Sequence, residues 1–406
     1  MVTVLSIVLW TSLAVVFYSY VGYPLLIFAT SRIARRWASN EARPVSCAAE
    51  STEAELPTVT VLIAAYNAEQ QIRQRIQNLL ACDYPPERLQ ILIASDGSTD
   101  GTVQLAREFD RANVAVIPFP QRSGKARTLV AAVEFVTSQV IVFTDAATEF
   151  ESMAIRRLAE HFVDPAIGIV AGKVAILDEH GRESESLYWK SEMMVRRSEA
   201  ELGLLMGVSG AVYAMRRSIF VAPRRPTIND DMVLPMLAHL KHRCKFVFEE
   251  SALAYAVSSG GLKTEFRRRC RIGAGGFQSL AVLSCLFRLQ HFRQAAAFTS
   301  HKLLRWICPF LLILILACNV GLLVMPGYQR LLCIQGAAYL LAVIGLFAPN
   351  RGLLTRVART ASAFLIMNLA ILAGFFQWLI HADQVLWNPT PRPATRPVLG
   401  TLPTRE

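Results

Sequence analysis

Two adjacent carboxylates, Asp230 and Asp231, lie within the stretch TINDDMVLPM at residues 227–236. One of two neighbouring acids can act as a general base, because the other helps to set its pKa. The same pair also fits an ordinary helix start, where the positive end of the helix dipole favours acidic side chains. The local pattern alone leaves both interpretations open.

Two further carboxylates each come at the end of an apolar run. Asp145 follows the run at residues 140–143, and Asp96 stands in ASDGSTDGT at residues 94–102. In the second stretch, the plain alternative is an Asp-Gly turn followed by a Ser or Thr that caps a helix. Acidic residues near a phosphate group usually act through a divalent cation, or they accept hydrogen bonds from ribose hydroxyls. These positions therefore predict a site that binds a nucleotide through carboxylates and polar turns.

Four arginines occur among residues 267–271, within the stretch FRRRCRIGAGGF. A guanidinium group is planar and can hold a departing diphosphate through two parallel hydrogen bonds, but a cluster beside a membrane also fits a lipid anchor. The glycines that follow the arginines would let the backbone approach a ligand. A second small-residue stretch, VSGAVYAMRR at residues 208–217, indicates either core or room for a bulky substrate.

Alternating apolar and amphipathic stretches predict the elements that position these side chains. The predicted strands are Val59–Ala65, Leu89–Ala94, Val114–Ile117 and Val140–Phe143. The predicted helices are Ala68–Leu80, Thr99–Phe109 and Gly124–Thr137. Continuous apolar strands separated by helices indicate an α/β fold with a mostly parallel sheet that helices cover on both faces.

The carboxyl ends of parallel strands meet at one edge of the sheet, where such folds bind their ligands. Polar clusters follow three of the predicted strands, at residues 65–67, 95–98 and 144–145. The first strand is not followed by GxGxxG, and the chain contains no GxxxxGK[ST]. These absences argue against a Rossmann dinucleotide site and exclude a P-loop ATPase.

Membrane helices are predicted from the distribution of apolar residues in the 406-residue chain, which is 53% hydrophobic and 18% charged. Residues 4–29 carry no charge, and the first basic residue, Arg32, comes after this run, so we expect an uncleaved anchor and not a signal peptide. The arginines at positions 32, 35 and 36 place the middle of the chain in the cytoplasm. Three later runs, at about 303–324, 331–348 and 361–381, predict further membrane helices.

Charge and cysteine content narrow the partners and the compartment. The net charge is +11, but no interleaving of basic and aromatic residues is present, so we expect contact with anionic membrane lipid and not with nucleic acid. The eight cysteines are scattered without a CxxC pair, which argues against a zinc site and fits a reduced compartment.

The order of the motifs resembles that of the membrane-embedded family 2 glycosyltransferases, which include hyaluronan, poly-N-acetylglucosamine and cellulose synthase catalytic subunits. The matching motifs, in chain order, are AAYN (64–67), DGSTD (96–100), GKA (124–126), FTDA (143–146), SGAVYAMRR (209–217), NDDMVL (229–234), RRCRIGAG (268–275) and LWNPTPR (386–392). Each motif is loose by itself, whereas the ordered series, over roughly residues 57–390, is specific.

The resemblance implies a GT-A fold that binds a nucleotide sugar, often a UDP-sugar, and it implies roles for individual residues. Nucleotide binding falls on Ala65, Tyr66, Asn67, Asp96, Lys125 and Asp145. Diphosphate binding falls on Arg268, Arg269 and Arg271, and Asp231 is the expected catalytic base with Asp230 beside it. The small residues Ser209, Gly210 and Ala211 are expected at the acceptor. Asp145 is also the expected ligand of Mg²⁺ or Mn²⁺.

Two departures from the family pattern affect these expectations. The second acid of the D-x-D element, normally a metal ligand, is replaced by Ala147, so that water, Thr148, Glu149 or the nearby arginines would have to compensate. The tryptophan of the Q-R-x-R-W element, a stacking surface for the acceptor sugar, is replaced by Ile272. Polymer synthesis is therefore less firmly predicted than the transfer of a single sugar.

The sequence thus predicts an inverting glycosyltransferase of exopolysaccharide or cell-envelope synthesis in the bacterial inner membrane, with its catalytic domain in the cytoplasm. The alternatives are transfer of one sugar to a lipid carrier and a non-catalytic scaffold of an export complex. The expected organisation is an anchor (1–30), a linker (31–56), a GT-A domain (57–265), a basic interface segment (266–300), three membrane helices (301–385) and a polar tail (386–406).

Overall fold

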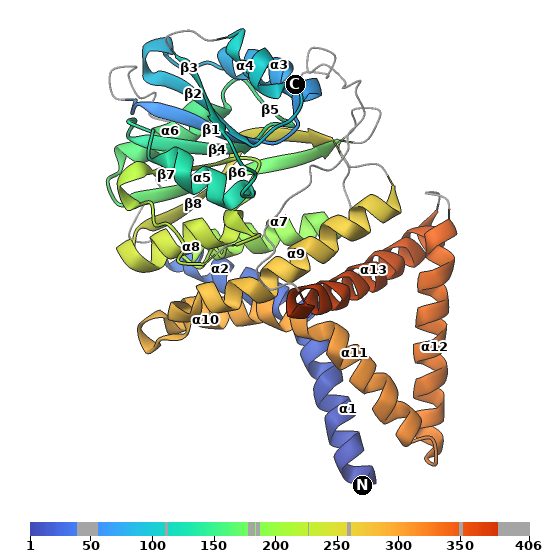
Figure 1. The fold of residues 1–406 in the computed structure, drawn as a ribbon. Helices are drawn as coiled ribbons and strands as arrows, with labels where there is room; N and C mark the ends of the chain where they lie inside the picture. Colours follow the sequence, from blue (N-terminus) through green and yellow to red (C-terminus); the bar gives the residue numbers. More distant parts are fainter. Residues whose placement is uncertain are drawn as a thin grey trace.

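The computed structural model describes residues 1–38, 56–109, 113–177, 183, 187–225, 227–257, 261–348 and 352–380. Most of the predicted linker, and the predicted polar tail with its LWNPTPR motif, lie outside these residues. In Figure 1, a sheet with its covering helices forms the upper part of the molecule, and long helices extend below it. A layer of helices lies between the two parts and runs across them.

The sheet has eight strands among the described residues, in the order β3-β2-β1-β4-β7-β6-β8-β5. The strands are β1 (Val59–Ala65), β2 (Leu89–Asp96), β3 (Val114–Phe119), β4 (Val140–Asp145), β5 (Thr148–Phe150), β6 (Ile167–Leu177), β7 (Tyr213–Arg216) and β8 (Lys245–Val257). The first four pair in parallel, as do β6 and β8, whereas β7 is antiparallel to both of its neighbours and β5 is antiparallel to β8. The predicted mostly parallel sheet is confirmed.

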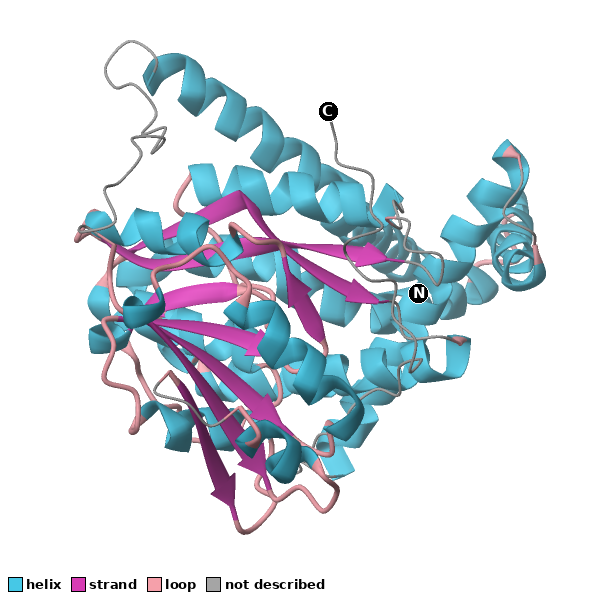
Figure 2. Cartoon of the chain, turned by 90° about the horizontal axis from the view of Figure 1, so that it is seen from above, coloured by secondary structure: helices cyan, strands magenta, loops and turns pink. Residues whose placement is uncertain are grey.

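Helices cover both faces of the sheet, which is why β1 is buried along its whole length. Val61 and Ile63 of β1 point into one core cluster together with side chains of α3 (Glu69–Leu80), α4 (Thr102–Arg107) and α6 (Ala154–Glu160). Leu62 and Ala64 point into the opposite cluster with side chains of α5 (Lys125–Val133) and α8 (Asp230–His242). Figure 2 shows the twisted strands fanning out between these helices.

The predicted strands and helices are present, but some ends differ. The strands β2, β3 and β4 run two residues further than predicted, so that Asp96 and Asp145 are the last residues of strands. Helix α4 begins at Thr102 and not at Thr99: Gly101 is its N-cap residue, and the Asp100 carboxylate just before it accepts the Thr102 N–H at 3.0 Å. Thr99, Asp100 and Gly101, which are predicted to be helical, lie before the helix instead.

Four helical segments of the described chain are long and apolar enough to cross a membrane, namely Val2–Trp37, Leu289–Gly321, Pro326–Phe347 and Leu353–Ile380. They contain the four predicted apolar runs, apart from a few residues at the run ends. They include α1 (Val2–Phe17), α2 (Tyr23–Ala38), α10 (Phe292–Phe298), α11 (Leu304–Gly321), α12 (Pro326–Phe347) and α13 (Leu353–Ile380). The N-terminal segment changes direction at the π-helical turn Tyr18–Gly22. After this turn, Tyr23 and Ile27 of α2 pack against Val195 of α7 (Leu187–Glu201).

The arginine-rich stretch belongs to one long helix, α9 (Leu262–Val282), which crosses between the sheet domain and the apolar helices. The expected use of its glycines to admit a ligand stays a prediction, and two of these glycines lie against other helices. A Cβ on Gly273 would lie 3.2 Å from the Cα of Ile371 in α13, and one on Gly276 would lie 2.8 Å from the indole of Trp306. These glycines allow helices to pack closely on α9.

Candidate active site

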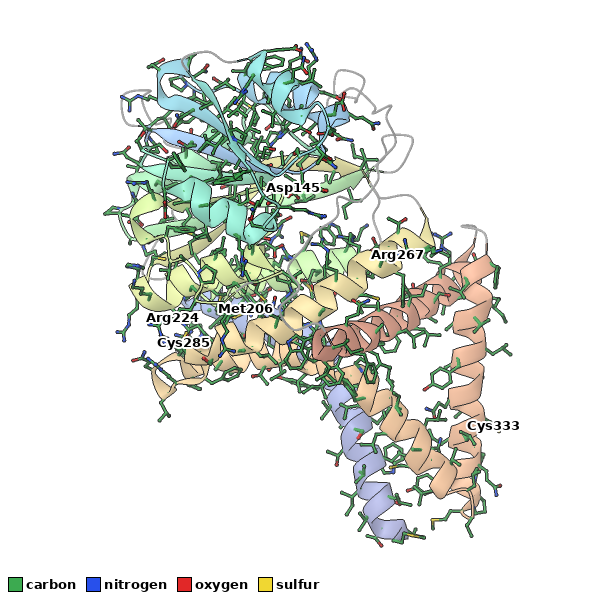
Figure 3. All side chains as sticks on the ribbon, viewed as in Figure 1. Asp145, Met206, Arg224, Arg267, Cys285 and Cys333 are labelled. Atoms are coloured by element: carbon green, nitrogen blue, oxygen red, sulfur yellow. The ribbon has the colours of Figure 1, made fainter. Side chains whose placement is uncertain are left out.

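A cavity of about 1270 Å³ lies between the sheet edge, the start of α8, helix α9 and the helices α11 and α13. Every residue that the sequence predicts for the site lines this cavity, except Ala65 and Asp96. Asp145 lies on the side of the sheet toward α9, the helix on which Figure 3 marks Arg267. The carboxylates and the arginines, predicted from distant parts of the sequence, therefore face one space.

Three carboxylates surround Lys125 at the sheet edge of the cavity. The Lys125 ammonium lies 2.7 Å from Asp145 Oδ1 and 3.5 Å from Asp230 Oδ2, and Asp231 is close enough to interact with it electrostatically. Burial disfavours the charged form of Lys125, but Asp145 and Asp230 more than offset this, so that the pKa of Lys125 is raised. Lys125 is therefore a permanent cation at neutral pH.

The two adjacent acids occupy different surroundings. Asp230 is only 5% exposed, and burial raises its pKa to about 6, although Lys125 lowers it and Asp231 raises it further. Asp231 is partly exposed in the cavity, and its Oδ2 accepts the N–H of Gly210 at 3.3 Å. Asp231 is thus the member of the pair that can reach a substrate. Both acids do begin helix α8, so the helix-start interpretation of the pair also holds.

Strand pairing explains why residues so far apart in the sequence converge here. Because β7 pairs antiparallel with β4, the chain before β7 lies beside the carboxyl end of β4. There the Thr144 hydroxyl donates to the carbonyl oxygen of Ala211 at 2.7 Å. The same loop is fixed to α8, because Val208 N–H donates to the backbone oxygen of Asp231 at 3.1 Å. A Cβ on Gly210 would lie 3.2 Å from Lys125 Nζ, so this glycine leaves room for the ammonium.

The side chains of Ala65 and Asp96 lie behind the cavity wall. Ala65 belongs to the sheet core. The Asp96 carboxylate is 1% exposed and accepts the backbone N–H groups of Ser123 at 2.6 Å and of Gly124 at 2.9 Å. Asp96 thereby holds the start of α5, and with it Lys125. A direct contact of either residue with a nucleotide stays a prediction.

The AAYN turn does reach the cavity. Asn67 adopts a left-handed backbone conformation with φ of 46°, and its Oδ1 accepts the Thr99 N–H at 2.9 Å. This bond joins the turns that follow β1 and β2. The guanidinium carbon of Arg122 lies 3.9 Å from the centre of the Tyr66 ring, so a loop before α5 covers the same turn.

The three predicted diphosphate-binding arginines do not have the same partners. Arg268 and Arg269 both form ion pairs with Glu265, at 2.9 and 2.7 Å. Arg271 lies nearer the acids: burial lowers its pKa, and Asp230, Asp145 and Asp231 oppose that shift. Arg271 is therefore a half-buried cation on the carboxylate side of the cavity.

Two residues that sequence reasoning missed hold Arg271 in place. Asn229 Nδ2 donates to the carbonyl oxygen of Ile272 at 3.1 Å, and Gln278 Oε1 accepts the Ile228 N–H at 2.9 Å. Both bonds join α9 to the loop before α8, next to Asp230 and Asp231. The position of Asn229 before two acids resembles a helix cap in the sequence, and nothing local shows that its side chain contacts another helix.

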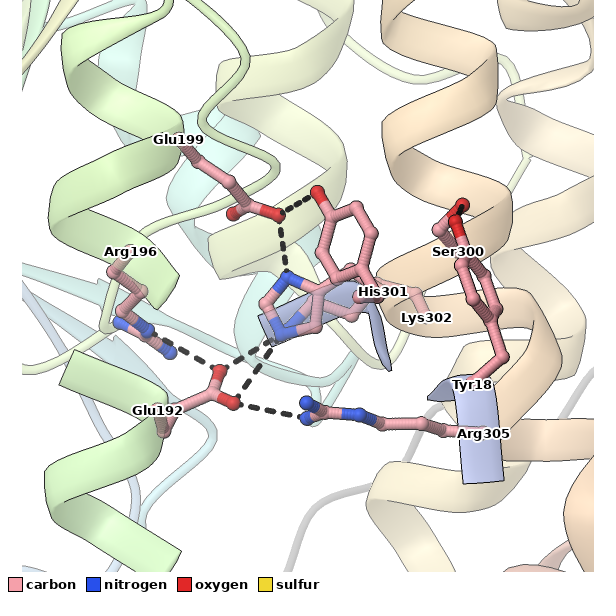
Figure 4. A network of polar contacts seen from close by, with 9 residues as sticks. Tyr18, Glu192, Arg196, Glu199, Ser300, His301, Lys302 and Arg305 are labelled. Carbon is pink, nitrogen blue, oxygen red and sulfur yellow. Dashed lines mark hydrogen bonds and ion pairs between the residues drawn. The ribbon is translucent and has the colours of Figure 1, made fainter. Parts of the chain in front are cut away.

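A second polar cluster lines the membrane end of the cavity (Figure 4). His301 is 1% exposed and bridges two glutamates of α7, with Nδ1 2.8 Å from Glu199 and Nε2 3.2 Å from Glu192. Lys302 and Arg305 also contact Glu192, at 3.4 and 3.0 Å. Sequence reasoning missed this cluster, although a histidine at the start of an apolar run is a usable signal.

Around Asp145, the side chains offer few ligands for a divalent cation, which prefers several oxygen atoms. Ala147 has none, Thr148 is fully buried in β5, and Glu149 is 8% exposed and accepts a hydrogen bond from Gln74 at 2.7 Å. Within the described ranges, no group of three or more His, Cys, Asp and Glu side chains could hold a metal ion. The residues at this edge therefore do not form a protein-built site for Mg²⁺ or Mn²⁺.

Comparisons with known proteins agree on one family. Residues 60–222 match the family model described as glycosyl transferase family 2. The poly-beta-1,6-N-acetyl-D-glucosamine synthase of Staphylococcus aureus is 26% identical over 235 residues, 56% of this chain and 56% of the relative. The probable glycosyltransferase YdaM of Bacillus subtilis is 34% identical over 130 residues, 30% of this chain and 31% of the relative. The chain thus spans about half the length of the first of these curated relatives and less of the second.

A solved structure has a similar fold over nearly the whole chain. It is the mannosyltransferase PcManGT from Pyrobaculum calidifontis in complex with GDP-Man and Mn²⁺, with a TM-score of 0.69 and 18% sequence identity. The similarity covers 92% of this chain and 99% of that one. This agreement confirms the predicted GT-A fold, with membrane-helix candidates at both ends of the described chain.

Proposed function

Because residues 60–222 form a family 2 glycosyltransferase domain, we propose that this glycosyltransferase moves a sugar from a nucleotide-sugar donor to a glycan in the bacterial cell envelope. The observation that carries the proposal is the convergence of Asp231, Asp145, Lys125 and Arg271 on one cavity. The sequence similarity to a polysaccharide synthase supports the acceptor class. We take a UDP-sugar as the donor to be tested first, and a GDP-sugar second.

The proposed reaction is a single displacement that inverts the anomeric carbon. Asp231 accepts the proton of the acceptor hydroxyl, and the hydroxyl oxygen attacks the anomeric carbon in line with the departing nucleoside diphosphate. The Gly210 N–H holds the Asp231 carboxylate toward the cavity. The turn at Tyr66 and Asn67 contacts the nucleoside, and Arg271 stabilises the charge on the leaving diphosphate.

The second candidate acceptor is a lipid carrier with a phosphate group. This candidate is favoured by the extension of the cavity to Lys302, Arg305 and Arg359, beside the apolar side chains of Met367 and Ile371. Cations next to an apolar wall at the start of membrane helices suit a lipid phosphate. Ile272, which is 42% exposed, also lacks the flat surface that a growing glycan chain would use.

The proposed location is the inner membrane, with the sheet domain in the cytoplasm. The support is the cluster Arg32, Arg35 and Arg36 at the end of the N-terminal helical segment. Export-complex partners remain a proposal with no surface assigned to them.

The test uses purified full-length protein in lipid nanodiscs and a panel of labelled UDP- and GDP-sugars. Asp231→Asn should lower transfer by about 10²- to 10⁴-fold, as expected for loss of a general base, while nucleotide binding persists. The matched control is Asp164→Asn. The partly exposed Asp164 carboxylate lies just before β6, at the end of that strand away from the cavity, so its loss should leave transfer unchanged. An active Asp231→Asn enzyme would refute the assignment of the base. Labelled product that enters organic solvent identifies the lipid acceptor, and water-soluble polymer identifies the glycan.

A further inference from the structure

We propose that Lys125 replaces the divalent cation: its ammonium receives the donor's diphosphate at Asp145, and sugar transfer proceeds without a bound metal ion. This inference rests on the proposed function and concerns the charge chemistry of the same site. It follows from the position of the ammonium, from the way the fold fixes it, and from the poor supply of metal ligands.

The ammonium lies between the end of β4, the start of α8 and the loop that contains Gly210. Nζ lies 2.7 Å from Asp145 and 3.5 Å from Asp230, and it would lie 3.2 Å from a Cβ on Gly210. An ammonium group has three donor directions. The contacts with Asp145 and Asp230 account for two of them, and the side chain also lines the cavity with 15% of its surface exposed. One donor direction is therefore left for a ligand oxygen.

Backbone hydrogen bonds fix the position of Lys125 at the start of α5. It is the first residue of α5, after Gly124 with a positive φ of 95°. The Asp96 carboxylate accepts the N–H groups of Ser123 and Gly124, which fixes the chain just before the lysine. A cation positioned by buried backbone bonds needs little reorganisation to meet a diphosphate, which is the condition for strong electrostatic stabilisation.

The same geometry disfavours a divalent ion. A metal ion on Asp145 would lie within a few ångströms of the Lys125 ammonium, and like charges at that distance repel strongly away from bulk water. The position two residues after Asp145, where a second acid would offset the repulsion, is Ala147. Glu149 cannot serve as it stands, because it is buried and accepts a hydrogen bond from Gln74.

The first experiment measures binding of UDP and of GDP to the full-length protein in nanodiscs by calorimetry, in excess EDTA and in Mn²⁺. Electron paramagnetic resonance of Mn²⁺ is recorded in parallel. We expect the better of the two nucleotides to bind in EDTA within about tenfold of its affinity in Mn²⁺, and we expect no Mn²⁺ signal from the protein alone. Binding that requires Mn²⁺ would overturn the role of Lys125 but leave the proposed function intact. No binding of either nucleotide under any condition would refute both.

Variants test the lysine itself. Lys125→Met should weaken nucleotide binding in EDTA by about 10- to 100-fold, because a hydrogen bond between charged groups is lost. Lys125→Arg should retain most of the binding. The matched control is Lys245→Met, which removes an exposed lysine paired with Asp164 on the other side of the domain and should leave binding unchanged. Unchanged binding by a folded Lys125→Met protein would overturn the inference.

A gain-of-function variant keeps the inference testable if Lys125→Met does not fold. Ala147→Asp supplies a second carboxylate near Asp145. The single variant Ala147→Asp, which keeps Lys125, should therefore bind Mn²⁺ and give an Mn²⁺ signal that the wild-type protein lacks. If the wild-type protein already gives the same Mn²⁺ signal as Ala147→Asp, the inference that Lys125 takes the place of a metal ion is refuted.

Discussion

Replacing Asp230 with Asn should stabilise the protein more at neutral than at acidic pH. In the folded protein, burial raises the pKa of Asp230 to about 6, Lys125 lowers it in part, and Asp231 and Asp145 raise it. In the unfolded chain, the pKa returns to about 4. A carboxyl group with a raised folded-state pKa binds its proton more tightly in the folded state. Its contribution to stability is therefore full below about pH 4 and is lost as the pH rises through about 6.

The expected size follows from these two pKa values. Complete ionisation of Asp230 costs the folded state about 3 kcal/mol, of which about half is already present at about pH 5. Between about pH 5 and about pH 7.5, the stability of Asp230→Asn relative to wild type should therefore rise by about 1.4 kcal/mol. For a domain of this size, the corresponding increase in the Tm difference is about 3–6 °C. Lys125 keeps its closer partner, Asp145, in the variant.

The assay is thermal unfolding in nanodiscs, followed by tryptophan fluorescence at both pH values. Asp164→Asn is the matched control. The pKa of Asp164 is lowered by the N–H of Ala166 and by Lys245, so its contribution changes only below about pH 4. The Tm difference between Asp164→Asn and wild type should therefore be the same at both pH values. If the Tm of Asp230→Asn minus that of wild type stays constant or falls as the pH rises, the assignment of a raised pKa to the Asp230 carboxyl is refuted.

Three further predictions concern helices around the cavity. Arg271→Lys should weaken binding of the donor nucleotide, measured by calorimetry, by about 10- to 100-fold because paired hydrogen bonds are lost; unchanged affinity would reassign Arg271 to lipid contact. Glu192→Gln leaves the partly buried cations Lys302 and Arg305 without the charge of a buried carboxylate and should lower stability by about 3–5 kcal/mol, seen as a lower Tm; an unaltered Tm would contradict this. Gly374→Ala places a Cβ against the α9 backbone and should cost about 1–3 kcal/mol, whereas Gly336→Ala, which meets open space, should not change the Tm.

Much of the sheet domain could be predicted from the sequence because the apolar runs and polar ends of its strands are patterns of neighbouring residues. The apolar run Val59–Ala65 coincides with β1, since a strand covered on both faces must be apolar throughout. The polar residues at the strand ends mark the edge at which a ligand binds, because parallel strands end on the same side. The same reasoning located the apolar helices, whose length is set by the span they have to cross.

The roles of individual polar residues could not be predicted in this way. Asp96 and Asp145 both end apolar strands, but one turns inward to fix a backbone loop and the other lines the cavity. Asp230 and Asp231 are chemically identical neighbours, and the packing around α8 alone buries the first and leaves the second partly exposed. Such differences arise from what lies opposite a side chain, and residue order does not encode that.

The sequence by itself therefore determined the class of fold, the apolar helices and the set of groups available for chemistry, because burial and periodicity act over a few neighbouring residues. The tertiary structure decided which of those groups meet. Glu192 and His301 are 109 residues apart in the chain and 3.2 Å apart in space. Lys125 lies 3.5 Å from Asp230, although the chain between them passes through the strands β4 to β7 and the helices α6 and α7. Contacts of this kind depend on the packing of whole elements against one another, which only the folded chain supplies.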